Sequence, residues 1–109
     1  MPRDKLSVSV GDEVLVRTDD TIHLSTPKKY NVVFFNDDYT PIEFVVTVLM
    51  DIFHHSEDIA KEIAQMVHDE GKAIAGTYNF EIAEQKSLES ISQARADKHP
   101  LQVKLEPVA

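Results

Sequence analysis

The chain of 109 residues has the length of one ordinary domain, and its 42% hydrophobic and 28% charged residues are typical of a globular protein that can bury a core. Nineteen acidic residues against eleven basic ones give a formal net charge of −8, which argues against binding to nucleic-acid phosphates or anionic membranes and favours a cationic partner or ligand. Because the chain has no cysteine, disulfide bonds, cysteine–zinc sites and thiol catalysis are excluded.

Residues 1–27 differ in pattern from the rest of the sequence. Their apolar residues come in short pieces broken by Gly11 and by acids, and only Val14-Leu15-Val16 could form a short strand. No apolar signal-peptide core opens the chain and no apolar run could span a membrane, so we expect neither secretion nor membrane insertion. We expect residues 1–27 to be a flexible N-terminal extension and residues 28–109 to be the core domain.

The core pattern begins with a strand and a helix. Residues 30–35 are β-branched and aromatic, which predicts a strand that ends at Asn36-Asp37-Asp38. Thr40-Pro41-Ile42-Glu43 then predicts a helix start, with Thr40 and Glu43 forming a capping box. Apolar residues at three- and four-residue steps continue this helix to Phe53.

A second helix is predicted from Ser56 to a left-handed stop at Gly71, and a strand over residues 72–78 follows it. A third helix is predicted from Asn79 to about Asp97, and a half-exposed strand over residues 101–105. We expect the third helix to turn these residues inward: Ile82, Ala83, Leu88, Ile91 and Ala94. We expect these charged residues of the same helix to point largely outward: Glu81, Glu84, Lys86, Glu89 and Arg95. The order β-α-α-β-α-β predicts an α+β fold with three helices on one face of a three-stranded antiparallel sheet.

Two polar features could carry function. Asn36, Asp37 and Asp38 are ordinary turn formers, and a lone helical His68 is ordinarily structural. An amide oxygen, a carboxylate and a neutral imidazole are nevertheless three hydrogen-bond acceptors, so Asn36, Asp38 and His68 could surround a primary ammonium group. A hydrolase with His68 as base and Asp38 as its orienting group would lack a nucleophile. Since no metal or cofactor motif occurs in the sequence, we expect no metal and no cofactor.

Several motifs resemble the signature of the ClpS family, the adaptors of the bacterial N-end rule. The resemblance extends over about residues 28–106 and is carried by residues 30–45, Val67-His68-Asp69-Glu70-Gly71-Lys72-Ala73, Gly76-Thr77-Tyr78, Ala83-Glu84-Gln85-Lys86 and His99-Pro100-Leu101. It implies an adaptor and not an enzyme. ClpS proteins bind N-degrons, which are proteins with a bulky hydrophobic first residue, and deliver them to the N-terminal domain of the AAA+ unfoldase ClpA or ClpC for degradation by ClpP. The resemblance also implies a monomer of the bacterial cytoplasm rather than of the plastid stroma, with no nucleic-acid or membrane partner.

The resemblance also assigns roles to individual residues of this sequence. Asn36, Asp38 and His68 would hold the α-amino group of the substrate. Glu81 and Lys86 would dock the unfoldase, and the N-terminal extension would engage the unfoldase pore. The hydrophobic pocket would be formed by Asp37, Thr40, Ile42, Val45, Ala64, Val67 and Leu101.

Two of these pocket positions, Ile42 and Ala64, depart from the family, in which methionine is usual at both. Ile42 is β-branched and stiff, and Ala64 is small, so we expect a roomier pocket and a changed order of preference among bulky first residues, with Leu losing or β-branched residues gaining. The alternative interpretation is an interaction module that resembles the C-terminal domain of the ribosomal stalk protein, which shares this layout but lacks an amine pocket.

Overall fold

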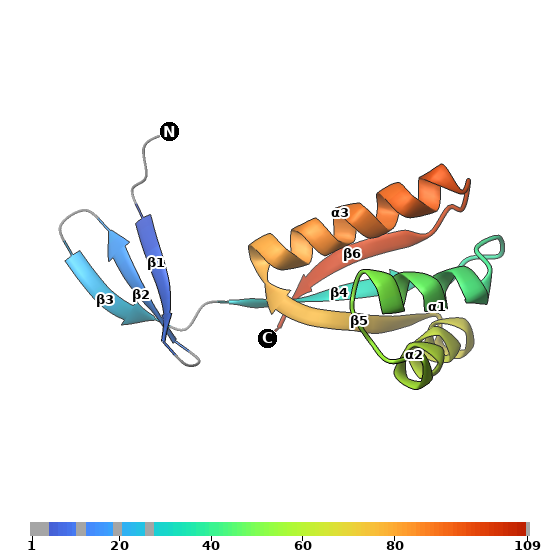
Figure 1. Ribbon diagram of the computed structural model, residues 1–109, viewed down its shortest axis with the longest axis horizontal. Helices are drawn as coiled ribbons and strands as arrows, with labels where there is room; N and C mark the ends of the chain where they lie inside the picture. Colours follow the sequence, from blue (N-terminus) through green and yellow to red (C-terminus); the bar gives the residue numbers. More distant parts are fainter. Residues whose placement is uncertain (1–4, 11–12, 19–20, 26–27, 109) are drawn as a thin grey trace.

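The computed structural model describes residues 5–10, 13–18, 21–25 and 28–108, with side chains from residue 28 onward (Figure 1). The core sheet is antiparallel in the order β5-β4-β6 and is formed by β4 (Lys29–Phe35), β5 (Lys72–Asn79) and β6 (Gln102–Pro107). Its helices are α1 (Ile42–Asp51), α2 (Glu57–Glu70) and α3 (Phe80–Ala96). The predicted order β-α-α-β-α-β, with the helices on one face of the sheet, is confirmed.

A second sheet precedes the core. Its strands β1 (Lys5–Val10), β2 (Glu13–Thr18) and β3 (Thr21–Ser25) pair in that order, each antiparallel to the next. Only the middle of β2 was expected, and the sequence signal that was missed for β1 is the strict alternation of apolar residues with serine. The flexibility predicted for residues 1–27 and the domain boundary at residue 28 stay predictions, because the side chains of these residues and several of their turns lie outside the described part of the chain.

The two faces of the core sheet differ in composition. Phe34 lies opposite Ala73 on β5 and Val103 on β6, and this face is buried beneath the helices. The other face carries polar residues such as Lys72, Lys104 and Glu106. Successive side chains of a strand point to opposite faces, so the pattern of β4 and its partners decides which face the helices cover.

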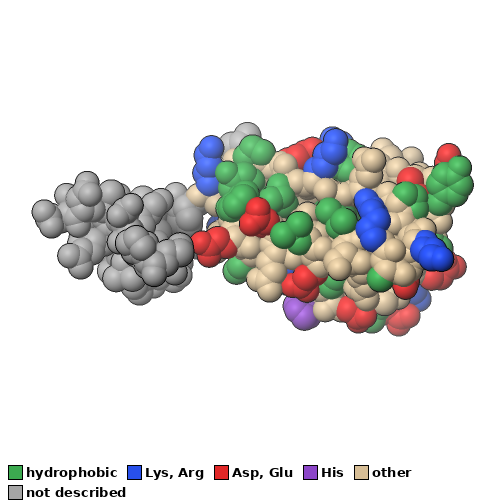
Figure 2. Space-filling model, turned by 90° about the horizontal axis from the view of Figure 1, so that it is seen from above, with side chains coloured by type: hydrophobic (Ala, Val, Ile, Leu, Met, Phe, Trp, Pro, Cys, Tyr) green, Lys and Arg blue, Asp and Glu red, His purple; other side chains and the backbone are tan. Residues whose placement is uncertain are grey.

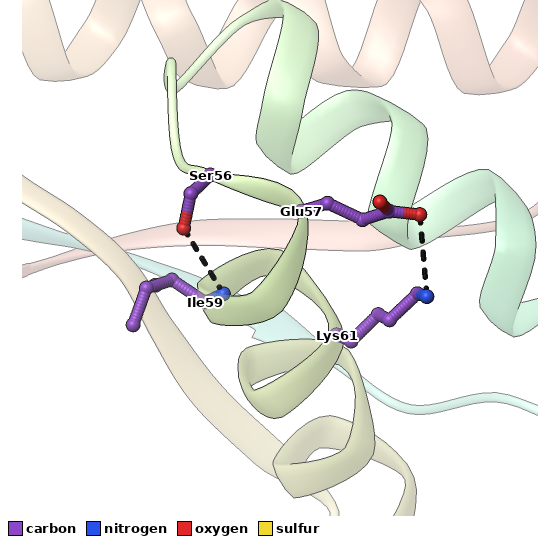
Figure 3. Close-up of polar contacts among 4 residues, drawn as sticks. All are labelled: Ser56, Glu57, Ile59 and Lys61. Carbon is purple, nitrogen blue, oxygen red and sulfur yellow. Dashed lines mark hydrogen bonds and ion pairs between the residues drawn. The ribbon is translucent and has the colours of Figure 1, made fainter.

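Helix α2 begins and ends where the sequence predicts. The Ser56 hydroxyl accepts the N–H of Ile59 at 3.3 Å, and the ion pair of Lys61 with Glu57, at 3.2 Å, lies one turn further along (Figure 3). At the other end Gly71 adopts φ 88°, a left-handed conformation that a side chain would disfavour. These two ends determine which residues of α2 face the sheet.

The inward faces of α2 and α3 are formed by small residues. Ala60, Ala64 and Val67 are buried on α2, and Ala83, Ser87, Ser90 and Ala94 are buried on α3. The expectation that Ile82 and Leu88 point inward is wrong, since they are 42% and 60% exposed. Seen from the side of α3, hydrophobic side chains are interspersed with both kinds of charge (Figure 2). Small inner residues let helix and sheet approach closely, which periodicity alone does not reveal.

Lys86 is another residue of α3 whose placement differs from expectation. It was expected to point largely outward, but it is half-buried and its Nζ donates to the carbonyl of Ile52 at 2.6 Å. The same ammonium lies 5.8 Å from the ring centroid of Phe53 and 5.3 Å from that of Tyr78. Lys86 therefore stabilises the C-terminal end of α1 against α3 and β5.

Among the described residues, no helix has the length and apolarity needed to cross a bilayer.

Candidate functional site

A small hollow, with a cavity volume of about 10 Å³ in this structure, lies where the end of β4, the start of α1, the C-terminal half of α2 and the residue before β6 meet. Its lining combines polar residues of a turn with apolar residues of two helices. The lining residues are Phe35, Asn36, Asp37, Thr40, Ile42, Val45, Ala64, Val67, His68 and Leu101.

Nine of these ten residues were named as site residues from the sequence, and the structure brings them together around one hollow. Asp38 was also named, but it lies exposed in the adjoining turn and does not line the hollow. Phe35 was missed. Its ring lies under the ammonium groups of Lys72 and Lys104, at 5.9 and 5.4 Å. Its position as the last residue of β4, directly before the polar turn, is the only sequence signal that could have indicated it.

The apolar wall of the hollow is well packed. Val45, Ala64, Val67 and Leu101 are each at most 5% exposed and belong to the core of the protein or pack directly on it. Ile42, at 37% exposed, stands on the solvent side of this wall. Four well-packed side chains and one exposed β-branched side chain thus form an apolar recess that is open at one side.

Asp37 organises the polar side of the hollow. Its Oδ1 accepts the N–H groups of Tyr39 and Thr40, both at 2.8 Å, and its Oδ2 accepts the Thr40 hydroxyl at 2.7 Å. The predicted capping box of Thr40 with Glu43 is therefore wrong. Pro41 is the N-cap of α1 and has no side-chain acceptor, so Thr40 lies one residue before the cap, and its hydroxyl donates to Asp37. The carboxylate of Asp37 thus fixes the turn that leads into α1.

The hydrogen bonds around Asp37 also affect its ionisation. Burial alone would raise the pKa of Asp37, but the Thr40 hydroxyl, the N–H groups of Tyr39 and Thr40 and the charge of His99 outweigh burial. The pKa therefore lies below the ordinary value of 3.8. Asp37 is an anion that holds the turn, and its oxygens are largely occupied by the turn itself.

Replacement of Asp37 by alanine is expected to lower the free energy of unfolding by about 1 kcal/mol near neutral pH, the cost typical of losing a side-chain cap. A carboxylate whose pKa is lower in the folded state stabilises the protein above its unfolded pKa and loses this effect as the pH falls through the folded value. The difference between the two proteins should therefore shrink below the ordinary pKa of 3.8 in urea unfolding at several pH values. Thr40→Val, which replaces the hydroxyl by a methyl group, should have a free energy of unfolding between those of wild type and Asp37→Ala. A difference that does not change with pH would contradict this role of the Asp37 charge.

A backbone hydrogen bond places the turn beside the end of α2. The N–H of Asn36 donates to the carbonyl of Gly71 at 2.9 Å, and Gly71 ends the helix that carries His68 three residues earlier. Asn36, Asp38 and His68 are all exposed, and the hydrogen bonds within the described core leave their side chains without a protein partner. An amide oxygen, a carboxylate and an imidazole are therefore available at the polar rim for an external donor group.

The two residues expected to dock an unfoldase lie on α3, outside the lining of the hollow. Glu81 is exposed in the first turn of α3, and Lys86 makes the contacts with Ile52, Phe53 and Tyr78 described above. Nothing in these contacts bears on docking, which stays a prediction.

Within the described residues, no group of three or more histidine, cysteine, aspartate or glutamate side chains could hold a metal ion.

Comparisons with known proteins give one consistent result. The family model of the ATP-dependent Clp protease adaptor protein ClpS matches residues 25–104. The ATP-dependent Clp protease adapter protein ClpS of Neisseria meningitidis serogroup B is 43% identical over 82 residues, which are 75% of this chain and 82% of that protein. A solved structure described as Agrobacterium tumefaciens ClpS2 bound to L-phenylalaninamide is similar with a TM-score of 0.73 and 38% identity, and the match covers 75% of this chain and 99% of that chain.

Proposed function

Because this chain belongs to the ClpS family of Clp protease adaptor proteins, we propose that it binds proteins through a bulky hydrophobic first residue and delivers them to a Clp unfoldase. Binding and transfer need no covalent step, so the proposed mechanism is equilibrium recognition followed by hand-off.

The observation that supports this proposal best is the composition of the hollow. Its apolar wall of Val45, Ala64, Val67 and Leu101 lies beside a polar rim formed by Asn36 and His68. Only the first residue of a protein carries a free ammonium group and a side chain on the same carbon. The ammonium group would donate to the rim while the side chain is buried against the wall. An internal residue has an amide in place of the ammonium group and would leave the rim acceptors without a charged donor.

The ligand of the Agrobacterium relative has the same chemistry. L-Phenylalaninamide carries a free amine and a benzyl group on one carbon, as the first residue of a protein does. For this chain we propose that Asn36, Asp38 and His68 accept hydrogen bonds from the amine and that the seven predicted pocket residues surround the side chain. Asp38 would approach from the adjoining turn, since it does not line the hollow itself.

Delivery is the second part of the proposal. We propose that the N-terminal domain of ClpA or ClpC docks near Glu81 and Lys86 on α3, and that the core domain over residues 28–109 acts as a monomer in the bacterial cytoplasm. Residues 1–27 would act as the extension that engages the unfoldase. Support comes from the family membership and from the exposure of Glu81.

The direct test is isothermal titration of a peptide that begins with Phe, compared with the same peptide acetylated at its N-terminus. Acetylation removes the positive charge and two donors, so we expect the free peptide to bind and the acetylated peptide to show no measurable binding. Mass spectrometry of the recovered peptide should find it intact. Equal affinity for both peptides, or no binding of either peptide, would contradict the proposal and favour an interaction module like that of the ribosomal stalk. A cleaved peptide would indicate a hydrolase.

A further inference from the structure

The segment that joins α3 to β6 forms one wall of the hollow. Leu101, its last residue, is 1% exposed and lines the hollow directly. The segment itself belongs to neither a helix nor a strand, and Lys98 within it has φ 62°, a left-handed conformation that is uncommon for a residue with a side chain. The position of Leu101 therefore depends on contacts that hold this segment in place.

Arg95 supplies two of these contacts. Its guanidinium nitrogen Nη1 donates to the carbonyl of His99 and to the carbonyl of Leu101, both at 2.9 Å. A basic residue in the last turn of a helix ordinarily bonds the last helical carbonyls. Here α3 ends at Ala96, and both acceptors lie beyond it in the chain. Arg95 therefore fixes the segment after the helix, including the residue that lines the hollow.

The same segment packs on the first turn of α1. The ring of His99 lies edge-on to the ring of Phe44, with 4.7 Å between centroids, and its charge contributes to the low pKa of Asp37. Asp37 in turn holds the backbone of Tyr39 and Thr40. One arginine is thus connected to the apolar wall of the hollow through Leu101 and to the first turn of α1 through His99.

We infer that Arg95 is a positioning residue for N-terminal residue recognition, because it holds Leu101 at the wall and His99 against the first turn of α1. It acts on the ligand through these residues and does not itself line the hollow. The inference rests on the proposed function, since it states how that binding site is held.

Titration of a Phe-starting peptide into wild type, Arg95→Ala and Arg95→Lys tests this. We expect the alanine variant to bind about tenfold more weakly, which corresponds to the lower range for hydrogen bonds to a charged group. The lysine variant should recover part of the affinity, because an ammonium group can still donate to one of the two carbonyls. Lys61→Ala, which removes an exposed cation paired with Glu57 on α2, controls for the loss of a positive charge and should bind like wild type.

A thermodynamic cycle with Leu101→Ala separates positioning from a general loss of stability. If Arg95 acts through Leu101, Arg95→Ala should cost clearly less affinity in the Leu101→Ala background than in wild type. An equal cost in both backgrounds, or wild-type affinity of Arg95→Ala, would overturn the inference.

A measurement without peptide keeps this inference distinct from the proposed function. The N–H of His99 donates to the carbonyl of Ala94 at 2.8 Å, so its hydrogen exchange reports on the order of the segment. Exchange at His99 should be at least about tenfold faster in Arg95→Ala than in wild type, and unchanged in Lys61→Ala. If wild type binds no peptide, the proposed function fails, while unchanged exchange in Arg95→Ala would refute the positioning role by itself.

Discussion

Asp38→Ala is expected to weaken the binding of a Phe-starting peptide by at least about tenfold, because a hydrogen bond to a charged group contributes about 1.5–3 kcal/mol and each 1.4 kcal/mol corresponds to a factor of ten. Asp38 is exposed in the turn between Asp37 and Tyr39, so solvent screens its charge and the lower end of this range applies. Titration at low and at moderate ionic strength should show that Asp38→Ala loses more affinity for the peptide at low salt.

Two variants show whether the loss at Asp38 is specific. Asp38→Asn keeps an oxygen acceptor without the charge, so it should bind between wild type and the alanine variant. Asp51→Ala removes another exposed acid at the far end of α1 and should leave the affinity unchanged. If Asp38→Ala binds as tightly as wild type, the amine is held by Asn36 and His68 without Asp38, in agreement with the absence of Asp38 from the lining of the hollow.

Local sequence signals determine most of the core fold. Ser56 and Asn79 accept backbone N–H groups at the starts of α2 and α3, and Gly71 ends α2 in the left-handed conformation, as their residue types predict. Such signals depend on atoms within a few residues of one another, so the sequence contains them almost completely. The Thr40 cap failed because α1 begins one residue later than predicted, with Pro41 as its N-cap, and the Thr40 hydroxyl donates to Asp37.

The packing of the helices was harder to predict. The period of α3 suggests an apolar stripe but does not say that Ser87 and Ser90 would be buried while Leu88 is exposed. Burial of Ser90 is acceptable because its hydroxyl donates to the carbonyl of Lys86 at 2.8 Å. Which residues approach the sheet is decided by helix position across it, and that position depends on long-range contacts.

The site was predicted mostly through motif resemblance, since the residue types alone favoured an ordinary turn and a structural histidine. Asn36 and Gly71 are 35 positions apart, and their hydrogen bond, which brings the turn to the end of α2, exists only in the folded sheet. The contacts of Arg95 with the segment before β6 likewise depend on where α3 ends relative to the sheet. No periodicity or short motif indicated Arg95, so its role could be inferred only from the structure.

Ala64 determines how large a side chain the hollow accepts. It is 2% exposed on α2 and lines the apolar wall together with Val67. A leucine at this position would extend into the recess that a Phe or Trp side chain is proposed to occupy. Burial of such a side chain contributes about 1.5–3 kcal/mol, so Ala64→Leu should weaken Phe- and Trp-starting peptides by about 10- to 100-fold.

Ala64→Leu should leave the proposed amine contacts at Asn36 and His68 in place, so peptides that begin with a smaller residue such as Val should lose much less affinity. Titration of peptides that begin with Leu, Phe, Tyr, Trp, Ile and Val measures this, and the wild-type series tests whether Ile42 and Ala64 change the order of preference. Gln65→Leu adds the same side chain at the next, exposed position of α2 and should leave the series unchanged.

An equal loss of affinity for every peptide in Ala64→Leu would mean that the substitution disturbs α2 as a whole. A preference for large residues that survives the substitution would place their side chains outside this hollow, because Ala64 lines it.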